Sequence, residues 1–240
     1  MLSKTKTAST RIEIRGLVKR YHFLPVLDDL SLSIDDGSLC VLVGANGAGK
    51  TTILRILAGL IRPDAGEIKV GGQFINEGSQ FRRQLGYVGH QPMFYHDLTA
   101  AENLLHYAYL YQLTEAAERV QTSLRSVGLL DHQNKPVRTF SRGMQQRLSI
   151  ARALLHDPNI LLFDEPYTGL DQEAAVFLDE RLQSLHQPGR AILLAAHRPQ
   201  RLLTIASHIA WLKNGKIGLH LPVTRLSESP ELRNYLQETA

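Results

Sequence analysis

The chain has 240 residues, of which 43% are hydrophobic and 21% are charged, a composition that excludes disordered and fibrous proteins. Its single cysteine, Cys40, excludes an internal disulfide, and no apolar run approaches the roughly 18–20 residues of a membrane-spanning helix. The first ten residues are polar and lack the apolar core of a secretory signal. We therefore expect a cytoplasmic protein.

The formal net charge of +4 originates at one end of the chain. Residues 1–20 carry six lysines and arginines but only one acid, Glu13. This pattern favours a solvated N-terminal segment and leaves open an attraction to an anionic membrane surface. Nucleic acid is not an expected partner, because no aromatic residues alternate with these charges before Tyr21.

The first half of the chain alternates short strands with glycine-rich connections. Strands are predicted at residues 11–17, 30–34, 67–70 and 73–75. The continuous apolar run at residues 39–43 is typical of a strand buried on both faces, and a helix follows to about residue 60.

The second half is mostly helical. Residues 99–155 have a helical pattern that breaks near Gly128 and at Pro136. Two further apolar strands are predicted at residues 159–163 and 191–196, with a helix between them. The order strand, helix, strand predicts an α/β fold around a parallel sheet, with the helical middle as an insertion packed beside it.

A phosphate-binding loop follows the buried strand. Residues 44–51, GANGAGKT, match the pattern G-x-x-x-x-G-K-S/T in full. Glycines let backbone N–H groups surround phosphates at the start of a helix, the lysine supplies positive charge, and the hydroxyl is a ligand suited to Mg²⁺. The residues expected to contact a nucleotide here are Gly44, Asn46, Gly47, Gly49, Lys50, Thr51 and Thr52.

Two acids end the second apolar strand. Asp164 and Glu165 follow residues 160–163 directly, and ligands of open α/β sheets collect at the carboxyl ends of strands. Asp164 is expected to hold Mg²⁺, and Glu165 to take a proton from, or orient, an attacking water. The alternative, a pair of acids that only cap the next helix, loses support when the phosphate-binding loop is present.

Several further motifs, in this order, resemble those of the ATP-binding subunit of ATP-binding cassette (ABC) transporters, over about residues 11–220. Residues 140–147, FSRGMQQR, resemble the signature motif, and residues 168–171, TGLD, resemble the D-loop. Gln91 resembles the Q-loop glutamine, and His197 resembles the switch histidine. Tyr21 stands where the family stacks an aromatic ring on adenine, although packing is the alternative.

The resemblance implies a P-loop NTPase fold of the ABC ATPase type, with a mostly parallel sheet, N-terminal antiparallel strands and a helical subdomain. It implies one nucleotide-binding domain over residues 1–240, with its ATP-binding core at about 11–90 and 158–220. The helical subdomain is expected at about 91–157, and residues 221–240 as a C-terminal tail. It also implies ATP and Mg²⁺ as cofactors, with Thr51, Gln91 and Asp164 near the metal.

The resemblance further implies ATP hydrolysis by a head-to-tail dimer of two copies or of this chain and a related one. Ser141, Gly143 and Asp171 are then expected at the dimer seam, with Ser141 and Gly143 facing the partner's γ-phosphate. Glu165, His197 and Gln91 are expected to act in catalysis. The signature motif departs from the common pattern at Arg142 and Met144. Arg142 either adds charge near the partner's ATP or faces solvent.

The implied partner is an integral membrane transporter subunit on the inner face of the cell membrane. It is expected to dock near Gln91, where Met93, Phe94 and Tyr95 either line a groove or belong to the core. Within the family, the motifs most resemble the ATPase of the haem exporter of cytochrome c maturation. Alternatives are another small-molecule or drug exporter and a soluble ATPase of iron–sulfur cluster assembly.

Overall fold

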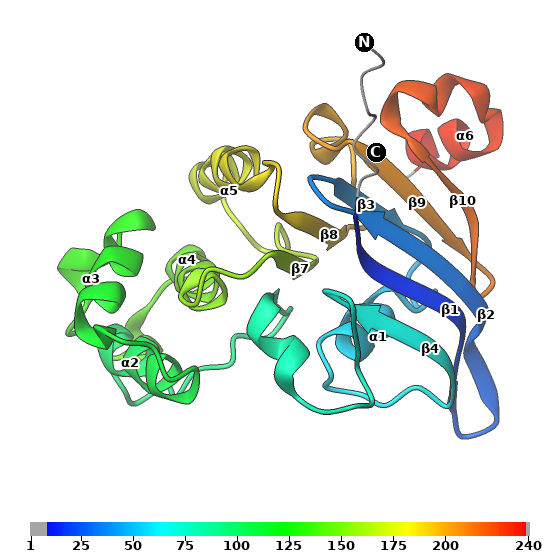
Figure 1. The fold of residues 1–240 in the computed structure, drawn as a ribbon. Helices are drawn as coiled ribbons and strands as arrows, with labels where there is room; N and C mark the ends of the chain where they lie inside the picture. Colours follow the sequence, from blue (N-terminus) through cyan, green and yellow to red (C-terminus); the bar gives the residue numbers. More distant parts are fainter. Residues whose placement is uncertain (1–8, 239–240) are drawn as a thin grey trace, which may run out of the picture.

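A six-stranded sheet forms the centre of the molecule, and the computed structural model describes residues 9–238 (Figure 1). Its strand order is β10-β9-β3-β8-β7-β6, and every neighbouring pair is parallel except β9 and β10. The strands are β3 (Leu39–Val43), β6 (Leu85–Val88), β7 (Ile160–Asp164), β8 (Ala191–Ala195), β9 (His208–Lys213) and β10 (Lys216–Pro222). The parallel sheet predicted from the sequence is confirmed, whereas β9 and β10 had not been predicted.

A second, antiparallel sheet has the order β2-β1-β4-β5. Its strands are β1 (Thr10–Tyr21), β2 (Leu24–Asp35), β4 (Ala65–Val70) and β5 (Gln73–Phe74). β1 and β2 are longer than the sequence predicted, because backbone pairing extends through charged residues such as Lys19, which pairs with Leu27. Lys4 and Lys6 of the basic N-terminal segment lie outside the described residues.

The helices α2, α3 and α4 gather on one side of the molecule, away from β1, β2 and β4 (Figure 1). The breaks predicted near Gly128 and Pro136 are confirmed: both fall between α3 and α4, and Gly128 has a φ of +68°. The α-helices are α1 (Lys50–Leu57), α2 (Ala100–Leu110), α3 (Ala116–Ser126), α4 (Arg142–Leu154), α5 (Gln172–Leu185) and α6 (Pro230–Glu238). The 3-10 helices are η1 (Gln80–Gln84), η2 (Leu130–His132), η3 (Val137–Thr139), η4 (Leu202–Thr204) and η5 (Val223–Glu228).

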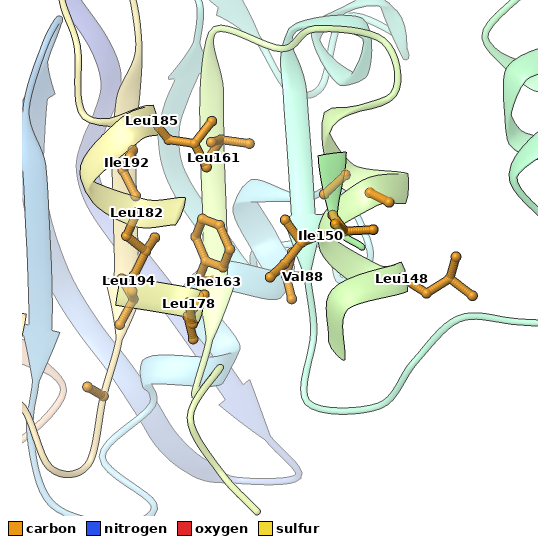
Figure 2. Close-up of a cluster of buried hydrophobic side chains, with 14 of the residues drawn as sticks. Val88, Leu148, Ile150, Leu161, Phe163, Leu178, Leu182, Leu185, Ile192 and Leu194 are labelled. Carbon is orange, nitrogen blue, oxygen red and sulfur yellow. The ribbon is translucent and has the colours of Figure 1, made fainter. Parts of the chain in front are cut away.

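Apolar side chains from the sheet, α4 and α5 form one core cluster (Figure 2). Leu178 and Leu182 of α5 lie beside Leu194 of β8, and Ile150 of α4 lies beside Val88 of β6. Each fully buried side chain of this size contributes about 1.5–3 kcal/mol to folding. This packing attaches α4 and α5 to the central sheet.

The segment expected to be a C-terminal tail contributes to the core instead. It contains η5 and α6, and Leu232 and Leu236 are buried in the same cluster as Trp211. The side chain of Gln200 donates a 2.7 Å hydrogen bond to the carbonyl of Leu236. The polar composition concealed this helix, because only one face of it is apolar. None of the described helices is long and apolar enough to cross a membrane.

Candidate nucleotide site

The loop between β3 and α1 has the backbone that a phosphate-binding loop requires. Gly47 and Gly49 have φ values of +78° and +108°, which L-residues with a β-carbon rarely adopt. A β-carbon at Gly49 would also lie 2.7 Å from Leu27. The buried ammonium of Lys50 donates hydrogen bonds to the carbonyls of Gly44 (2.7 Å) and Ala45 (3.1 Å), which hold it inside the loop.

The acids at the end of β7 lie next to this loop. Asp164 is 1% exposed, and its Oδ1 accepts a 2.8 Å hydrogen bond from the Thr51 hydroxyl. Burial raises the pKa of Asp164, and burial lowers the pKa of Lys50 even though Glu165 and Asp164 counteract that shift. Both charges are thus held in surroundings that disfavour them, as is typical of functional sites.

Glu165 has a backbone conformation that is rare for a residue with a side chain. Its φ is +50°, and its N–H donates a 3.0 Å hydrogen bond to the carbonyl of Ala195 in β8. Such backbone strain costs on the order of 1–3 kcal/mol and is common at functional sites. The tight turn aims the side chain toward the phosphate-binding loop, where it lines the pocket described next.

One open pocket of about 240 Å³ joins these elements. Most of the residues expected at the nucleotide line it, although they come from β1, the phosphate-binding loop, α1 and the end of β7. They are Tyr21, Asn46, Gly47, Gly49, Lys50, Thr51, Thr52 and Glu165. Tyr21 is 42% exposed, and the ammonium of Lys19 lies 5.7 Å from the centre of its ring.

His197 lies on the other side of Glu165. It follows β8 and is exposed, and it lines a second hollow of about 410 Å³ together with Glu165, Thr168 and Gly169. The carboxylate of Glu165 therefore borders both hollows.

Six of the expected residues line neither hollow of this chain. Two of them, Gly44 and Asp164, still contact lining residues through their hydrogen bonds with Lys50 and Thr51. The other four lie elsewhere. Ser141 caps α4 by accepting a 3.2 Å hydrogen bond from the Met144 N–H, and Gly143 follows it in the first turn. Asp171 caps α5 by accepting a 2.8 Å hydrogen bond from the Ala174 N–H. Gln91 is exposed in the loop after β6. The capping roles account for Ser141 and Asp171 within the single chain.

Sequence reasoning missed two residues that support the site. The hydroxyl of Tyr87 lies 3.5 Å from Oδ2 of Asp164, and the hydroxyl of Tyr235 in α6 forms a hydrogen bond with the backbone of Gly44. Tyr87 stands four residues before Gln91, the glutamine that resembles the Q-loop residue. Tyr235 has no sequence signal, because it reaches Gly44 only when α6 packs onto the core.

A divalent cation fits the oxygen atoms of Thr51 and Asp164. Both are hard ligands, and a positive ion would relieve the cost of burying the Asp164 carboxylate. In the described part of the chain, no cluster of three or more His, Cys, Asp or Glu side chains could hold a metal unaided. The remaining ligands of such a cation would therefore include phosphate oxygens and water.

Comparison with known proteins agrees with this geometry. Residues 27–168 match the family model described as ABC transporter. NatA of Bacillus subtilis, an ABC transporter ATP-binding protein, is 35% identical over 214 residues, which cover 87% of each chain. The bacitracin transport ATP-binding protein BcrA of Bacillus licheniformis is 35% identical over 95% of this chain and 74% of its own length. The Nod factor export ATP-binding protein I of Ralstonia nicotianae is 37% identical over 85% of this chain and 65% of its own length.

Solved structures extend the likeness to the whole fold. The ATP-binding subunit of an ABC transporter superimposes with a TM-score of 0.86 and 30% identity, over 96% of this chain and 99% of that one. A dimeric post-hydrolysis state of an ATP-binding cassette, bound to ADP and Pi, superimposes with a TM-score of 0.81 and 26% identity, over 88% and 98%. The chain therefore belongs to the ABC transporter family, as an ATP-binding subunit with the fold of an ABC ATPase.

Proposed function

We propose that this chain hydrolyses ATP at the pocket between the phosphate-binding loop and the end of β7, and that hydrolysis drives export through a membrane subunit. One observation supports the proposal most directly: Lys50, Thr51 and Glu165 line the same pocket. In addition, the Thr51 hydroxyl is hydrogen-bonded to Asp164. A relative described as a Nod factor export ATP-binding protein supports export as the direction.

Binding would use groups that the fold holds in position. The N–H groups of the loop and the Lys50 ammonium would contact the phosphates of ATP, and Tyr21 would stack on adenine. Thr51 and Asp164 would hold Mg²⁺, with Gln91 reaching toward it from its exposed loop. When bound, this cation neutralises charge on the phosphate oxygens.

Hydrolysis would proceed by in-line attack of water on the γ-phosphorus, which breaks the bond to the oxygen that remains on ADP. Glu165 would orient the water and accept its proton, since the carboxylate borders the pocket beside Lys50. His197 would donate a hydrogen bond to the transferred phosphoryl group from the neighbouring hollow. The products are ADP and inorganic phosphate.

Ser141, Gly143 and Asp171 would act on a second subunit. These residues lie at the N-terminal ends of α4 and α5, and none of them lines the nucleotide pocket of its own chain. A helix N-terminus presents unpaired N–H groups that favour anions. A head-to-tail dimer, of two copies or with a related chain, would bring Ser141 and Gly143 to the partner's γ-phosphate, and a dimeric relative supports this arrangement.

The membrane subunit would dock beside Gln91. Met93 and Tyr95 are 40% and 56% exposed, whereas Phe94 is buried, so only the first and third of these residues are free to contact a partner. A pocket of about 240 Å³ lined by Met93, Tyr107 and Arg152, among others, lies next to them. An inserted helix fits such a surface, and it would place the chain on the inner face of the membrane.

The cargo is proposed only by class. The relatives named above include a Nod factor exporter and a bacitracin transporter, and none of their descriptions mentions haem. Haem export for cytochrome c maturation therefore remains a prediction from motif likeness. The division into a core at 11–90 and 158–220 and a helical subdomain at 91–157 likewise remains a proposal.

The proposal is tested by affinity purification from detergent-solubilised membranes of the source cells with Mg-ATP present. Glu165→Gln should retain ATP and a closed dimer, and should co-purify with an integral membrane subunit. Glu180→Gln, at an exposed position on α5, is the matched control and should hydrolyse ATP like the wild type. Recovery of soluble scaffold proteins alone would contradict the transport function, and undiminished hydrolysis by Glu165→Gln would contradict its catalytic role.

A further inference from the structure

Arg142, the unusual residue of the signature motif, is not explained by its charge. It is exposed and is the first residue of α4, where the helix dipole disfavours a cation. Within residues 9–238 its guanidinium has no hydrogen bond or ion pair. Neither electrostatics nor hydrogen bonding within the chain therefore accounts for the position of this side chain.

The side chain lies across Gly169, in the loop of residues 168–171 between β7 and α5. A β-carbon at Gly169 would overlap with Nη1 of Arg142 and lie 3.2 Å from its Cζ and 3.3 Å from its Cδ. Gly169 has a φ of +75°, so its backbone turns sharply at the contact. Part of the Arg142 side chain thus covers the space beside Gly169, while the residue as a whole remains exposed.

The contact adds to a junction between the N-terminal parts of α4 and α5. A β-carbon at Gly143 would lie 3.2 Å from Cβ of Ala174. Arg147 Nη2 lies 3.2 Å from Oε1 of Glu173. These contacts join the start of α4 to the start of α5, and Arg142 extends the junction to the 168–171 loop.

The same loop contacts Glu165 at its other end. The Thr168 N–H donates a 3.1 Å hydrogen bond to the carbonyl of Glu165, and the Thr168 hydroxyl lies 3.4 Å from Oε2 of Glu165. One short loop therefore joins the carboxylate in the chain's own nucleotide pocket to Arg142, the neighbour of Ser141.

We propose that Arg142 is a positioning residue that holds the 168–171 loop against the start of α4. In this way the pocket that contains Glu165 and the surface that contains Ser141 change position together. The inference rests on the proposed function, in which these two regions serve different ATP molecules of a dimer. A planar guanidinium is suited to this role, because it covers a backbone turn without needing a carboxylate partner.

A double-mutant cycle on the full chain tests the proposal. Arg142→Ala removes the contact, and Gly169→Ala displaces the guanidinium. Each single variant should lower kcat for ATP about tenfold and leave KM within about twofold, a loss of about 1.4 kcal/mol in transition-state stabilisation. The double variant should also lose only about tenfold, because both changes remove the same contact.

Gly72→Ala is the matched control for backbone strain. Gly72 has a φ of +79°, and no atom lies within 4 Å of a β-carbon built there. It should leave kcat unchanged while lowering the melting temperature about as much as Gly169→Ala. Arg142→Met, which fills space without charge, should recover kcat to within about threefold of the wild type.

Three results would overturn the inference: a loss of about a hundredfold in the double variant, a tenfold rise in KM with kcat retained, or no recovery by Arg142→Met. A hundredfold loss in the double variant would mean that Arg142 and Gly169 act independently. A rise in KM, or no recovery by Arg142→Met, would mean that the Arg142 charge contacts phosphate directly. Hydrogen exchange gives a readout without turnover: Arg142→Ala should speed exchange at residues 168–171 and not in α1. ATP binding by Lys50→Ala at wild-type affinity would instead contradict the proposed nucleotide site.

Discussion

The Thr51 hydroxyl donates a 2.8 Å hydrogen bond to Oδ1 of Asp164, although 113 positions separate the two residues in the chain. The contact exists because β3 and β7 both pair in parallel with β8, so their carboxyl ends meet at one edge of the sheet. This edge is where open α/β sheets bind ligands. The strand order thus assembles the nucleotide pocket from two distant motifs.

Asp164→Asn should make the nucleotide-free chain more stable and less active. Burial raises the pKa of Asp164, so the ionised carboxylate is disfavoured in the folded chain. The neutral amide should raise the free energy of unfolding at pH 7 by about 1 kcal/mol, as measured by urea titration. Turnover should fall by about a hundredfold or more, because the cation site loses its charge.

The gain in stability should vanish as the pH falls below 3.8, the ordinary pKa of the carboxyl group. There Asp164 is protonated in both the folded and the unfolded chain, and no charge is buried. Asp131→Asn, at an exposed position, is the control and should change stability by less than about 0.5 kcal/mol. A destabilised Asp164→Asn protein at pH 7 would contradict this account.

His156 should make the fold sensitive to acid. It stacks on Tyr111 with ring centroids 3.8 Å apart, and its Nε2 lies 3.1 Å from the carbonyl of Leu85. Burial lowers its pKa to about 4, despite the opposing effects of that carbonyl and of Asp157. Its contribution to stability is therefore present above pH 6.5 and is lost as the pH falls from there toward 4.

The unfolding free energy should consequently decrease by about 2 kcal/mol more in the wild type than in His156→Phe between pH 7.5 and 4.5. Phenylalanine keeps the stack on Tyr111 and cannot be protonated. His96→Phe, at an exposed position, should retain the wild-type pH dependence. Parallel pH profiles for wild type and His156→Phe would show that His156 is not responsible.

Asn103→Leu should weaken the loop that follows Gln91. Asn103 is fully buried, its Oδ1 accepts a 2.9 Å hydrogen bond from the Tyr95 N–H, and its Nδ2 lies 3.0 Å from the carbonyls of Tyr95 and Thr99. Leucine would leave the Tyr95 N–H without this partner, whereas the carbonyls of Tyr95 and Thr99 keep bonds from the backbone N–H groups of Leu98 and Asn103. The expected cost is about 2 kcal/mol. Urea unfolding measures this loss, and Asn134→Leu at an exposed position should cost under about 0.5 kcal/mol.

Tyr235→Phe should weaken ATP binding although Tyr235 does not line the pocket. Its hydroxyl forms a hydrogen bond with the backbone of Gly44, and its ring lies 5.4 Å from that of Trp211. Loss of this bond frees the start of the phosphate-binding loop and should raise the Kd for ATP about fivefold, or about 1 kcal/mol. Fluorescent-nucleotide titration measures the change, and Tyr109→Phe at a 66% exposed site should bind normally.

The local chemistry of this protein can be predicted from its amino-acid sequence. The glycines of residues 44–51 and the acids Asp164 and Glu165 were identified from their order and from the apolar strands before them, because phosphate binding depends on backbone geometry encoded within a few residues. The parallel sheet followed from the strand–helix–strand order.

Contacts between distant residues, in contrast, depend on how the helices and strands pack. Tyr235 contacts Gly44 because α6 packs on the core, and Arg142 covers Gly169 because α4 and α5 pack together. Phe94 is buried, whereas Met93 and Tyr95 are exposed. The sequence does not predict this difference, because the three residues are adjacent and all apolar. Such contacts depend on packing between segments far apart in the chain, whereas periodicity and motif spacing describe only neighbours.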